Sequence, residues 1–257
     1  MNLNLTNKVA VITGASRGIG RSIAEALSRE GMLLVIAARS SDLLQEVARS
    51  CGKNVVVFAA DLRDEKSPGA LIEFAVEKFG TIDLVVNNAG ATKRGDFLEL
   101  TEEDWRDGFA LKLYSAVRCS RAAWPHLAKS KGSIVNIVGI GGRTGSADFS
   151  IGGSVNAALL NLTKALADRG NKDGVRVNAI NPGWIATDRL RSRITEFAED
   201  HRIGFDDAAA RMASDMGIRR FGAPEEIASA VAFLASDVSG YCQGTIFDID
   251  GGTTGTL

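Results

Sequence analysis

The chain has 257 residues, of which 45% are hydrophobic and 24% charged, a composition typical of a globular protein with a sizeable core. Its 30 basic and 31 acidic residues are well mixed, so no basic stripe or charged tail indicates nucleic-acid binding. No apolar run is long enough to span a membrane, and the first residues lack the pattern of a secretory signal. Three widely spaced cysteines favour a reducing compartment, so we expect a cytoplasmic protein with neither a disulfide framework nor a metal site.

Short apolar runs alternate with longer amphipathic segments along the chain. The short runs, which predict buried strands, are 8–13, 33–38, 54–60, 83–89, 132–138, 175–181 and 244–250. The longer segments, which predict helices, are 21–30, 42–51, 68–79, 105–123, 150–169 and 224–236. Strands buried on both faces and connected through helices form a parallel sheet. The fold class predicted is therefore α/β, a single-domain Rossmann-type doubly wound sheet of about seven parallel strands with helices on both faces.

No linker or repeat divides the chain, so residues 1–257 are expected to form one domain. Residues 187–222 are rich in Arg, Asp and Ala and fit no strand. We expect this segment to form a helical excursion over the edge of the sheet.

The turn after the first strand carries a glycine-rich motif, TGASRGIG, at residues 13–20. Gly14, Gly18 and Gly20 permit a tight turn, a close approach of the backbone to a pyrophosphate and close packing of the helix on the sheet. The N-terminus of the following helix adds amide donors and a favourable dipole for phosphates. This strand–turn–helix context predicts a dinucleotide-binding site, and a glycine-rich turn without a ligand is the alternative.

The end of the second strand indicates which dinucleotide is bound. An acidic residue there would bind a free ribose 2′-hydroxyl, whereas an arginine accommodates a 2′-phosphate. This chain has Arg39 at that point, no acidic residue before Asp42, and a second arginine, Arg17, within the glycine-rich turn. The two arginines favour NADP(H) over NAD(H), unless both are ordinary solvated surface residues.

Four motifs in chain order, TGASRGIG (13–20), NNAG (87–90), NPG (181–183) and DIDGG (248–252), resemble those of the classical short-chain dehydrogenase/reductase family. The resemblance covers essentially the whole chain. It implies an NADP-dependent oxidoreductase that acts on carbonyls or alcohols, a substrate lid at 187–222 and a homotetramer. Implied small-molecule partners are the cofactor and a substrate that the sequence does not identify.

The resemblance also assigns roles to individual residues. It implies that Asp61 contacts the adenine. It also implies that Asn87, Ala89 and Gly90 frame the ribose on the adenosine side and stabilise the central strand. The nicotinamide end would be held by Pro182, Gly183, Ile185 and Thr187. The expected cofactor-binding residues are Gly14, Ser16, Arg17, Gly18, Ile19, Gly20, Arg39, Asp61, Asn87, Ala89, Gly90, Pro182, Gly183, Ile185 and Thr187.

Family members use a catalytic tetrad of Asn, Ser, Tyr and Lys, in which Tyr and Lys lie one helical turn apart. The segment AALLNLTKALA (157–167) aligns without a gap to the family's active-site helix. This alignment puts Gly152 at the Tyr position and Asn156 at the Lys position, while Gly139 and Lys112 fall at the Ser and Asn positions. The resemblance therefore implies that all four positions are substituted and that the Ser-Tyr-Lys apparatus is missing.

Lys112 and Asn156 remain as candidate catalytic residues, because their exchange could leave an ammonium and an amide in one neighbourhood. The alternative is that Lys112 reaches solvent and Asn156 only binds a water. The two glycines are expected to leave room beside the nicotinamide. The sequence thus favours an atypical NADP(H)-dependent oxidoreductase. Its alternatives are an inactive NADP(H)-binding sensor or regulatory subunit paired with an active relative, and non-redox chemistry in an enlarged pocket.

Overall fold

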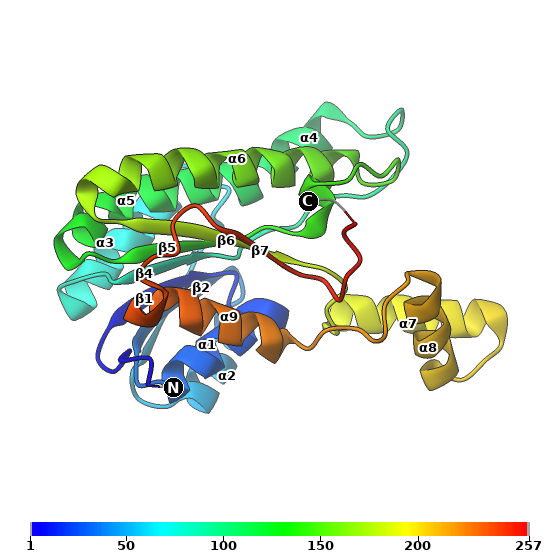
Figure 1. Ribbon diagram of the computed structural model, residues 1–257, viewed down its shortest axis with the longest axis horizontal. Coiled ribbons are helices and arrows are strands. Elements are labelled where there is room, and N and C mark those ends of the chain that lie inside the picture. The colour runs from blue at the N-terminus through cyan, green and yellow to red at the C-terminus, as the bar shows by residue number, and fades with distance from the viewer. Residues whose placement is uncertain (1, 256–257) are drawn as a thin grey trace.

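Seven parallel strands in the described part of the chain form one sheet, in the order β3-β2-β1-β4-β5-β6-β7 (Figure 1). The computed structural model describes residues 2–255. The sheet confirms the predicted α/β architecture. Its strands are β1 (Val9–Thr13), β2 (Leu33–Ala38), β3 (Val55–Ala59), β4 (Leu84–Asn87), β5 (Ser133–Ile137), β6 (Arg176–Pro182) and β7 (Ile246–Ile249).

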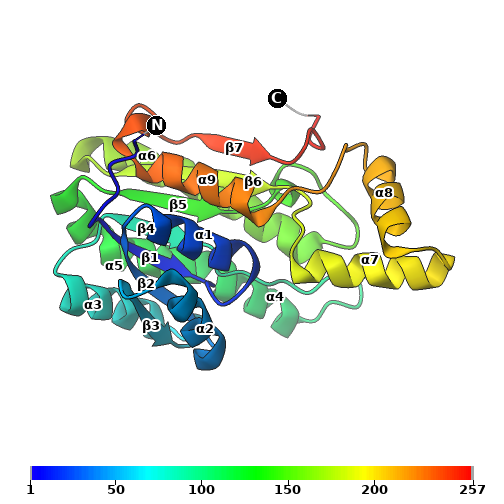
Figure 2. The ribbon, with the colours of Figure 1, turned by 90° about the horizontal axis from the view of Figure 1, so that it is seen from below.

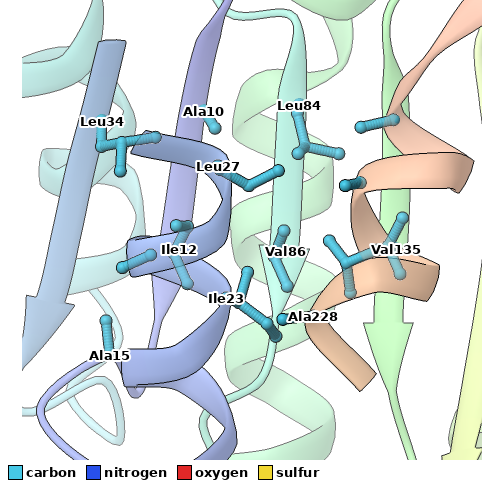
Figure 3. Packing of buried hydrophobic residues seen from close by; sticks show 14 of the residues in the cluster. Ala10, Ile12, Ala15, Ile23, Leu27, Leu34, Leu84, Val86, Val135 and Ala228 are labelled. Carbon is cyan, nitrogen blue, oxygen red and sulfur yellow. The ribbon is translucent and has the colours of Figure 1, made fainter. Parts of the chain in front are cut away.

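Helices cover both faces of the sheet (Figure 1). One face carries α1 (Gly18–Arg29), α2 (Ser41–Cys51) and α9 (Pro224–Ala235), and the other carries α3 (Ser67–Phe79), α5 (Ser115–Ser130) and α6 (Ser150–Asp173). In Figure 3, Ile23 and Leu27 of α1 and Ala228 of α9 lie over the side chains of β1, β4 and β5. Because helices cover both faces of the sheet, the strand side chains are buried on both sides. This explains why the strands appear in the sequence as continuous apolar runs rather than alternating ones.

The strand order reverses between β1 and β4, because β1 pairs with β2 on one side and with β4 on the other. In a doubly wound sheet, ligands bind beyond the carboxyl ends of the strands at this switch point. The turns that follow β1 and β4 are the glycine-rich turn and the NNAG motif, so the fold brings these two motifs together.

The helix expected over 105–123 is longer than predicted and has three parts. It comprises α4 (Glu102–Phe109), a π-helical turn (Ala110–Tyr114) and α5. Thr101 and Asp104 form a reciprocal capping box that fixes the start of α4 upstream of the expected helix. The π-helical turn interrupts regular helical geometry at Lys112, and such turns are frequent at functional sites.

Residues 187–222 form the expected helical excursion, consisting of α7 (Asp188–His201) and α8 (Phe205–Asp215). These two helices project beyond the sheet on the side toward which β7 points (Figure 2). They pack against each other through their own small apolar cluster, which includes Leu190, Ile194 and Met212. The excursion is anchored to the rest of the chain by a bridge between Ile185 and Gly222.

A buried polar network ties the centre of the sheet to two helices. The Asn87 amide on β4 donates to Asn136 Oδ1 on β5 at 2.8 Å and to Ser120 Oγ on α5 at 3.1 Å. The Asn136 amide donates in turn to Thr163 Oγ1 on α6 at 2.9 Å. Because these groups are buried, each donor that loses its acceptor carries the full cost of desolvation.

We expect Asn136→Ala to lower the free energy of unfolding by about 1–3 kcal/mol, because it leaves the Asn87 amide without its closest acceptor. Asn161→Ala, at an exposed position on α6, is the matched control and should change that free energy by less than about 0.5 kcal/mol. Chemical denaturation of both variants measures the difference, and equal stabilities would contradict a role for the network.

Candidate cofactor and active site

The glycine-rich turn is shaped by the closeness of its own backbone to the turn after β4. Gly14 and Gly18 have positive φ angles of 67° and 55°, which favour glycine. A Cβ atom on Gly20 would lie 2.3 Å from the Gly14 carbonyl oxygen, and one on Gly14 would lie 2.9 Å from the Ala89 Cα. No side chain fits at Gly14 or Gly20, so glycine at both positions lets the turn pack closely against the loop after β4.

Thr13 and Asn88 brace this arrangement, and the expected site residues did not include them. The buried Thr13 hydroxyl accepts hydrogen bonds from the backbone N–H groups of Asn88 and Ala89, both at 3.0 Å. The Asn88 amide donates to the carbonyl oxygens of Thr13 at 3.0 Å and Gly14 at 3.1 Å. Thr13 belongs to the TGASRGIG motif and Asn88 to the NNAG motif, so both lay within motifs that the sequence had singled out. Only the fold shows that the two residues contact each other's turns.

Arg17 and Arg39, the two arginines expected to bind the 2′-phosphate, follow the neighbouring strands β1 and β2. Arg17 is the residue that precedes α1, and Arg39 follows β2, the strand next to β1. Both side chains are exposed, and within residues 2–255 neither guanidinium forms an ion pair. Asp61, expected beside the adenine, pairs with Arg63 at 3.0 Å and keeps 41% of its side chain exposed.

The segment after β6 closes over the glycine-rich turn from the other side. A Cβ atom on Gly18 would lie 3.2 Å from the Thr187 methyl carbon, so the start of α7 touches the start of α1. Gly183 lies against the backbone of Asp250, and its N–H donates to Ile249 O at 3.0 Å. The expected phosphate-binding and nicotinamide-binding residues are thereby brought to one edge of the sheet.

Lys112 and Asn156 both donate to backbone carbonyl oxygens just beyond the carboxyl end of β5. The Lys112 ammonium donates to the carbonyl oxygen of Val138, and the Asn156 amide donates to that of the next residue, Gly139, at 3.4 Å. The ammonium is turned inward, so the alternative in which Lys112 reaches solvent is wrong. Asn156 is buried, and its Oδ1 has no hydrogen-bond partner among residues 2–255.

Burial, which removes hydration from the charged form, and the nearby Arg189 guanidinium together lower the pKa of Lys112 from 10.5 to about 8. Arg189 belongs to the first turn of α7. Keeping Lys112 protonated therefore costs free energy in the folded state. Within the described residues the ammonium makes one hydrogen bond.

The expectation of open space beside Gly152 is wrong, because the Phe149 ring fills it. A Cβ atom on Gly152 would lie 2.1 Å from the ring carbon Cζ of Phe149, and one on Gly141 would lie 2.9 Å from Cε1. The Arg94 guanidinium lies over the ring, 4.0 Å from its centroid, and pairs with Asp148 at 2.7 Å. The glycine at 152 is thus a packing requirement of Phe149, which the sequence pattern did not reveal.

Gly139 has a backbone conformation that residues with a side chain rarely adopt. Its φ of 128° favours glycine, and its N–H donates to Asn181 Oδ1 at 3.3 Å. Asn181 in turn donates to Asp248 at 2.8 Å, and Asp248 pairs with Arg143 at 3.2 Å. This chain of contacts holds the end of β5 against β6 and β7.

Two cavities lie elsewhere on the molecule, and none of Lys112, Gly139, Gly152 and Asn156 lines them. One of about 260 Å³ lies at the base of the excursion, between Trp184, Arg219 and Asp250, and another of about 230 Å³ lies between Arg63, Thr92 and Asp107. Across residues 2–255, no group of three or more His, Cys, Asp or Glu side chains is placed to hold a metal ion. Over the same residues, no helix has the length and apolar character needed to cross a membrane.

Sheet order, glycine-rich turn and braced loops together define a dinucleotide-binding α/β protein. The family profile described as enoyl-(acyl carrier protein) reductase matches residues 14–254. Meso-2,3-butanediol dehydrogenase of Serratia marcescens is 34% identical over 98% of this chain and 96% of its own length. A 3-oxoacyl-[acyl-carrier-protein] reductase of Escherichia coli is also 34% identical, over 97% and 98%.

Solved structures agree with this assignment. L-Sorbose reductase from Gluconobacter frateurii, in complex with NADPH and L-sorbose, superposes with a TM-score of 0.95 at 34% identity, covering 100% of both chains. The chain belongs to the classical short-chain dehydrogenase/reductase family of NAD(P)-dependent oxidoreductases.

We expect Gly152→Ala to lower the free energy of unfolding by about 1–3 kcal/mol, because the new methyl group displaces the Phe149 ring from its niche. In a Phe149→Ala background the same change should instead raise it by roughly 0.5–1 kcal/mol, because Ala is the better helix former. A double-mutant cycle by chemical denaturation measures this coupling. The same effect of Gly152→Ala in both backgrounds would refute the packing role.

Lys112→Met should raise the free energy of unfolding at neutral pH by roughly 2–3 kcal/mol, since it removes a desolvated charge. Between pH 8 and 10.5 the unfolded chain binds more protons at Lys112 than the folded chain does. Wild-type stability should therefore rise through this interval and the advantage of the variant should shrink. Thermal unfolding over that pH range measures both, and a constant difference would contradict the lowered pKa.

Proposed function

We propose that this protein is an NADP(H)-dependent oxidoreductase that interconverts a carbonyl and an alcohol with a rearranged set of catalytic residues. The observation that carries the proposal is the backbone cradle at Gly14 and Gly20, where no Cβ atom fits. It is supported by Arg17 and Arg39, which are exposed and form no ion pair within residues 2–255. Further support comes from L-sorbose reductase, a relative of the same fold in complex with NADPH.

The residues around this cradle fit the cofactor. Its backbone N–H groups and the N-terminus of α1, which has no acidic residue in its first turn, suit a pyrophosphate. Arg17 and Arg39 would bind the 2′-phosphate, and Asp61 would contact the adenine. The unpartnered Oδ1 of Asn156 is a buried acceptor for a ribose hydroxyl. The remaining residues proposed to line the site are Ser16, Gly18, Ile19, Asn87, Ala89, Gly90, Pro182, Gly183, Ile185 and Thr187.

Bound NADPH would supply the hydride, and the chain would supply orientation and a proton. We assign Lys112, Gly139, Gly152 and Asn156 to the positions of the family's Asn, Ser, Tyr and Lys. No tyrosine replaces the missing one, since Tyr241 is fully exposed and Tyr114 is half exposed, with Arg118 over its ring. A positioned proton donor contributes about 10²–10⁴ in rate, so turnover depends on a different acid.

Residues 187–222 are the proposed substrate lid. α7 starts in contact with the glycine-rich turn, while the rest of the excursion has its own apolar cluster and projects from the sheet. A segment that packs mainly on itself and is joined to the domain at one base is able to move as a unit. The cavity at this base lies between the lid and the end of β7.

A second candidate function is an inactive NADP(H)-binding sensor or regulatory subunit. The Phe149 ring favours it, because the ring occupies the space beside Gly152 and carries no ionisable group. The same ring argues against non-redox chemistry in an enlarged pocket, because it fills the space that such a pocket would need. Carbonyl turnover with NADPH separates the two remaining functions.

We expect Arg17→Ala and Arg39→Ala each to weaken NADPH binding by about 10- to 100-fold, as the loss of a charge-assisted hydrogen bond does. NADH binding should change little, since NADH lacks the 2′-phosphate. Arg49→Ala, in the last turn of α2, is a matched control that should affect neither nucleotide. Calorimetric titration tests this. Equal losses for NADPH and NADH, or no loss at all, would contradict the assignment.

A further inference from the structure

Lys112 reaches the candidate active site from an unusual element. It lies in the π-helical turn between α4 and α5, and its aliphatic stem runs across Gly90 at the end of β4. A Cβ atom on Gly90 would lie 3.0 Å from Cδ and 3.2 Å from Cγ of Lys112. The stem therefore packs between the π-helical turn, from which it comes, and Gly90 of the NNAG loop. This packing fixes where the ammonium points.

The ammonium and the buried Asn156 amide both bond to the backbone that follows β5. Val138 and Gly139 are consecutive, and their carbonyl oxygens accept from Lys112 and Asn156, respectively. An ammonium has three donors, and within residues 2–255 only one of them is used. The Oδ1 of Asn156 is a buried acceptor that has no partner among the same residues. Together the two side chains offer unused donors and an unused acceptor at the carboxyl end of β5.

No carboxylate neutralises Lys112 in the described part of the chain. The charged group that acts on it is the Arg189 guanidinium at the start of the proposed lid, which carries the same sign. With a pKa of about 8, the ammonium is mostly protonated at neutral pH and yet gives up its proton readily. An acid whose pKa lies near the working pH is the most effective proton donor.

We propose that the Lys112 ammonium is the proton donor of this site, in the role that the family gives to a tyrosine hydroxyl. This inference rests on the proposed oxidoreductase function. As the carbonyl carbon gains a hydride, an Nζ–H bond of Lys112 breaks and its proton goes to the carbonyl oxygen, which becomes a hydroxyl. The neutral amine then takes up a proton from solvent. Alcohol oxidation uses the same atoms in reverse, with the neutral amine as the base.

The first test measures reduction of a ketose, a diketone and a 3-oxoacyl thioester with NADPH, from about pH 6 to about pH 10. The wild-type rate should be constant at low pH and fall above about 8, since only the protonated amine donates. Lys112→Met should lower kcat by about 10²–10⁴-fold and remove this break. Lys112→Arg should also be inactive, because a guanidinium does not release its proton.

Lys164→Met, at an exposed position on α6, is the matched control and should keep the wild-type rate and pH profile. A readout independent of turnover comes from nuclear magnetic resonance of protein labelled with ¹³C at lysine Cε. One lysine should titrate near pH 8, and its signal should be missing in Lys112→Met but present in Lys164→Met. Retained stability of Lys112→Met, measured alongside, separates the loss of the proton donor from misfolding.

The outcomes distinguish this inference from the proposed function. Failure of the wild type to bind NADPH would overturn the proposed function. Turnover with an unchanged rate and pH profile in Lys112→Met would overturn only the assignment of Lys112. NADPH binding without turnover of any of the three substrates would overturn the proton-donor role and support the sensor instead.

Discussion

The contact between the turns after β1 and β4 is the constraint on which the rest of the site depends. Gly14, Gly20 and Ala89 come so close that Gly14 and Gly20 have no room for a Cβ atom, and Thr13 and Asn88 bind the two turns together. This contact directs the N-terminus of α1 and its free N–H groups to the edge of the sheet. The NNAG loop held there also carries Gly90, against which Lys112 packs.

At the other end of the site, the Phe149 ring fills the space that was expected to be open beside Gly152. Phe149 lies on Gly152 and Gly141, and Arg94 closes the other side of the ring. The local packing therefore leaves no hydroxyl group at position 152. The ammonium of Lys112, which comes from a different element, lies close to the end of β5. The proposed proton donor thus comes from the π-helical turn and not from α6.

Strands and cofactor turns could be predicted from the sequence, because Val/Ile runs and glycine spacing are local signals with a direct physical cause. The start of α4 and its π-helical turn were missed, since capping by Thr101 and the interruption at Lys112 do not alter the apolar periodicity. Phe149 was missed for another reason. Its ring folds back onto a glycine three residues ahead, and only the path of the chain into α6 makes that contact.

The sequence predicts an exchange of Lys112 and Asn156 but says nothing of their geometry. Only the fold shows that their donors go to consecutive carbonyl oxygens. A crystal structure of the protein with NADPH tests the central claim most directly. We predict the 2′-phosphate between Arg17 and Arg39, the Phe149 ring still on Gly152, and the Lys112 ammonium facing the space beside the nicotinamide ring where a substrate carbonyl would lie. An ammonium turned away from that space, or a nucleotide bound elsewhere, would contradict it.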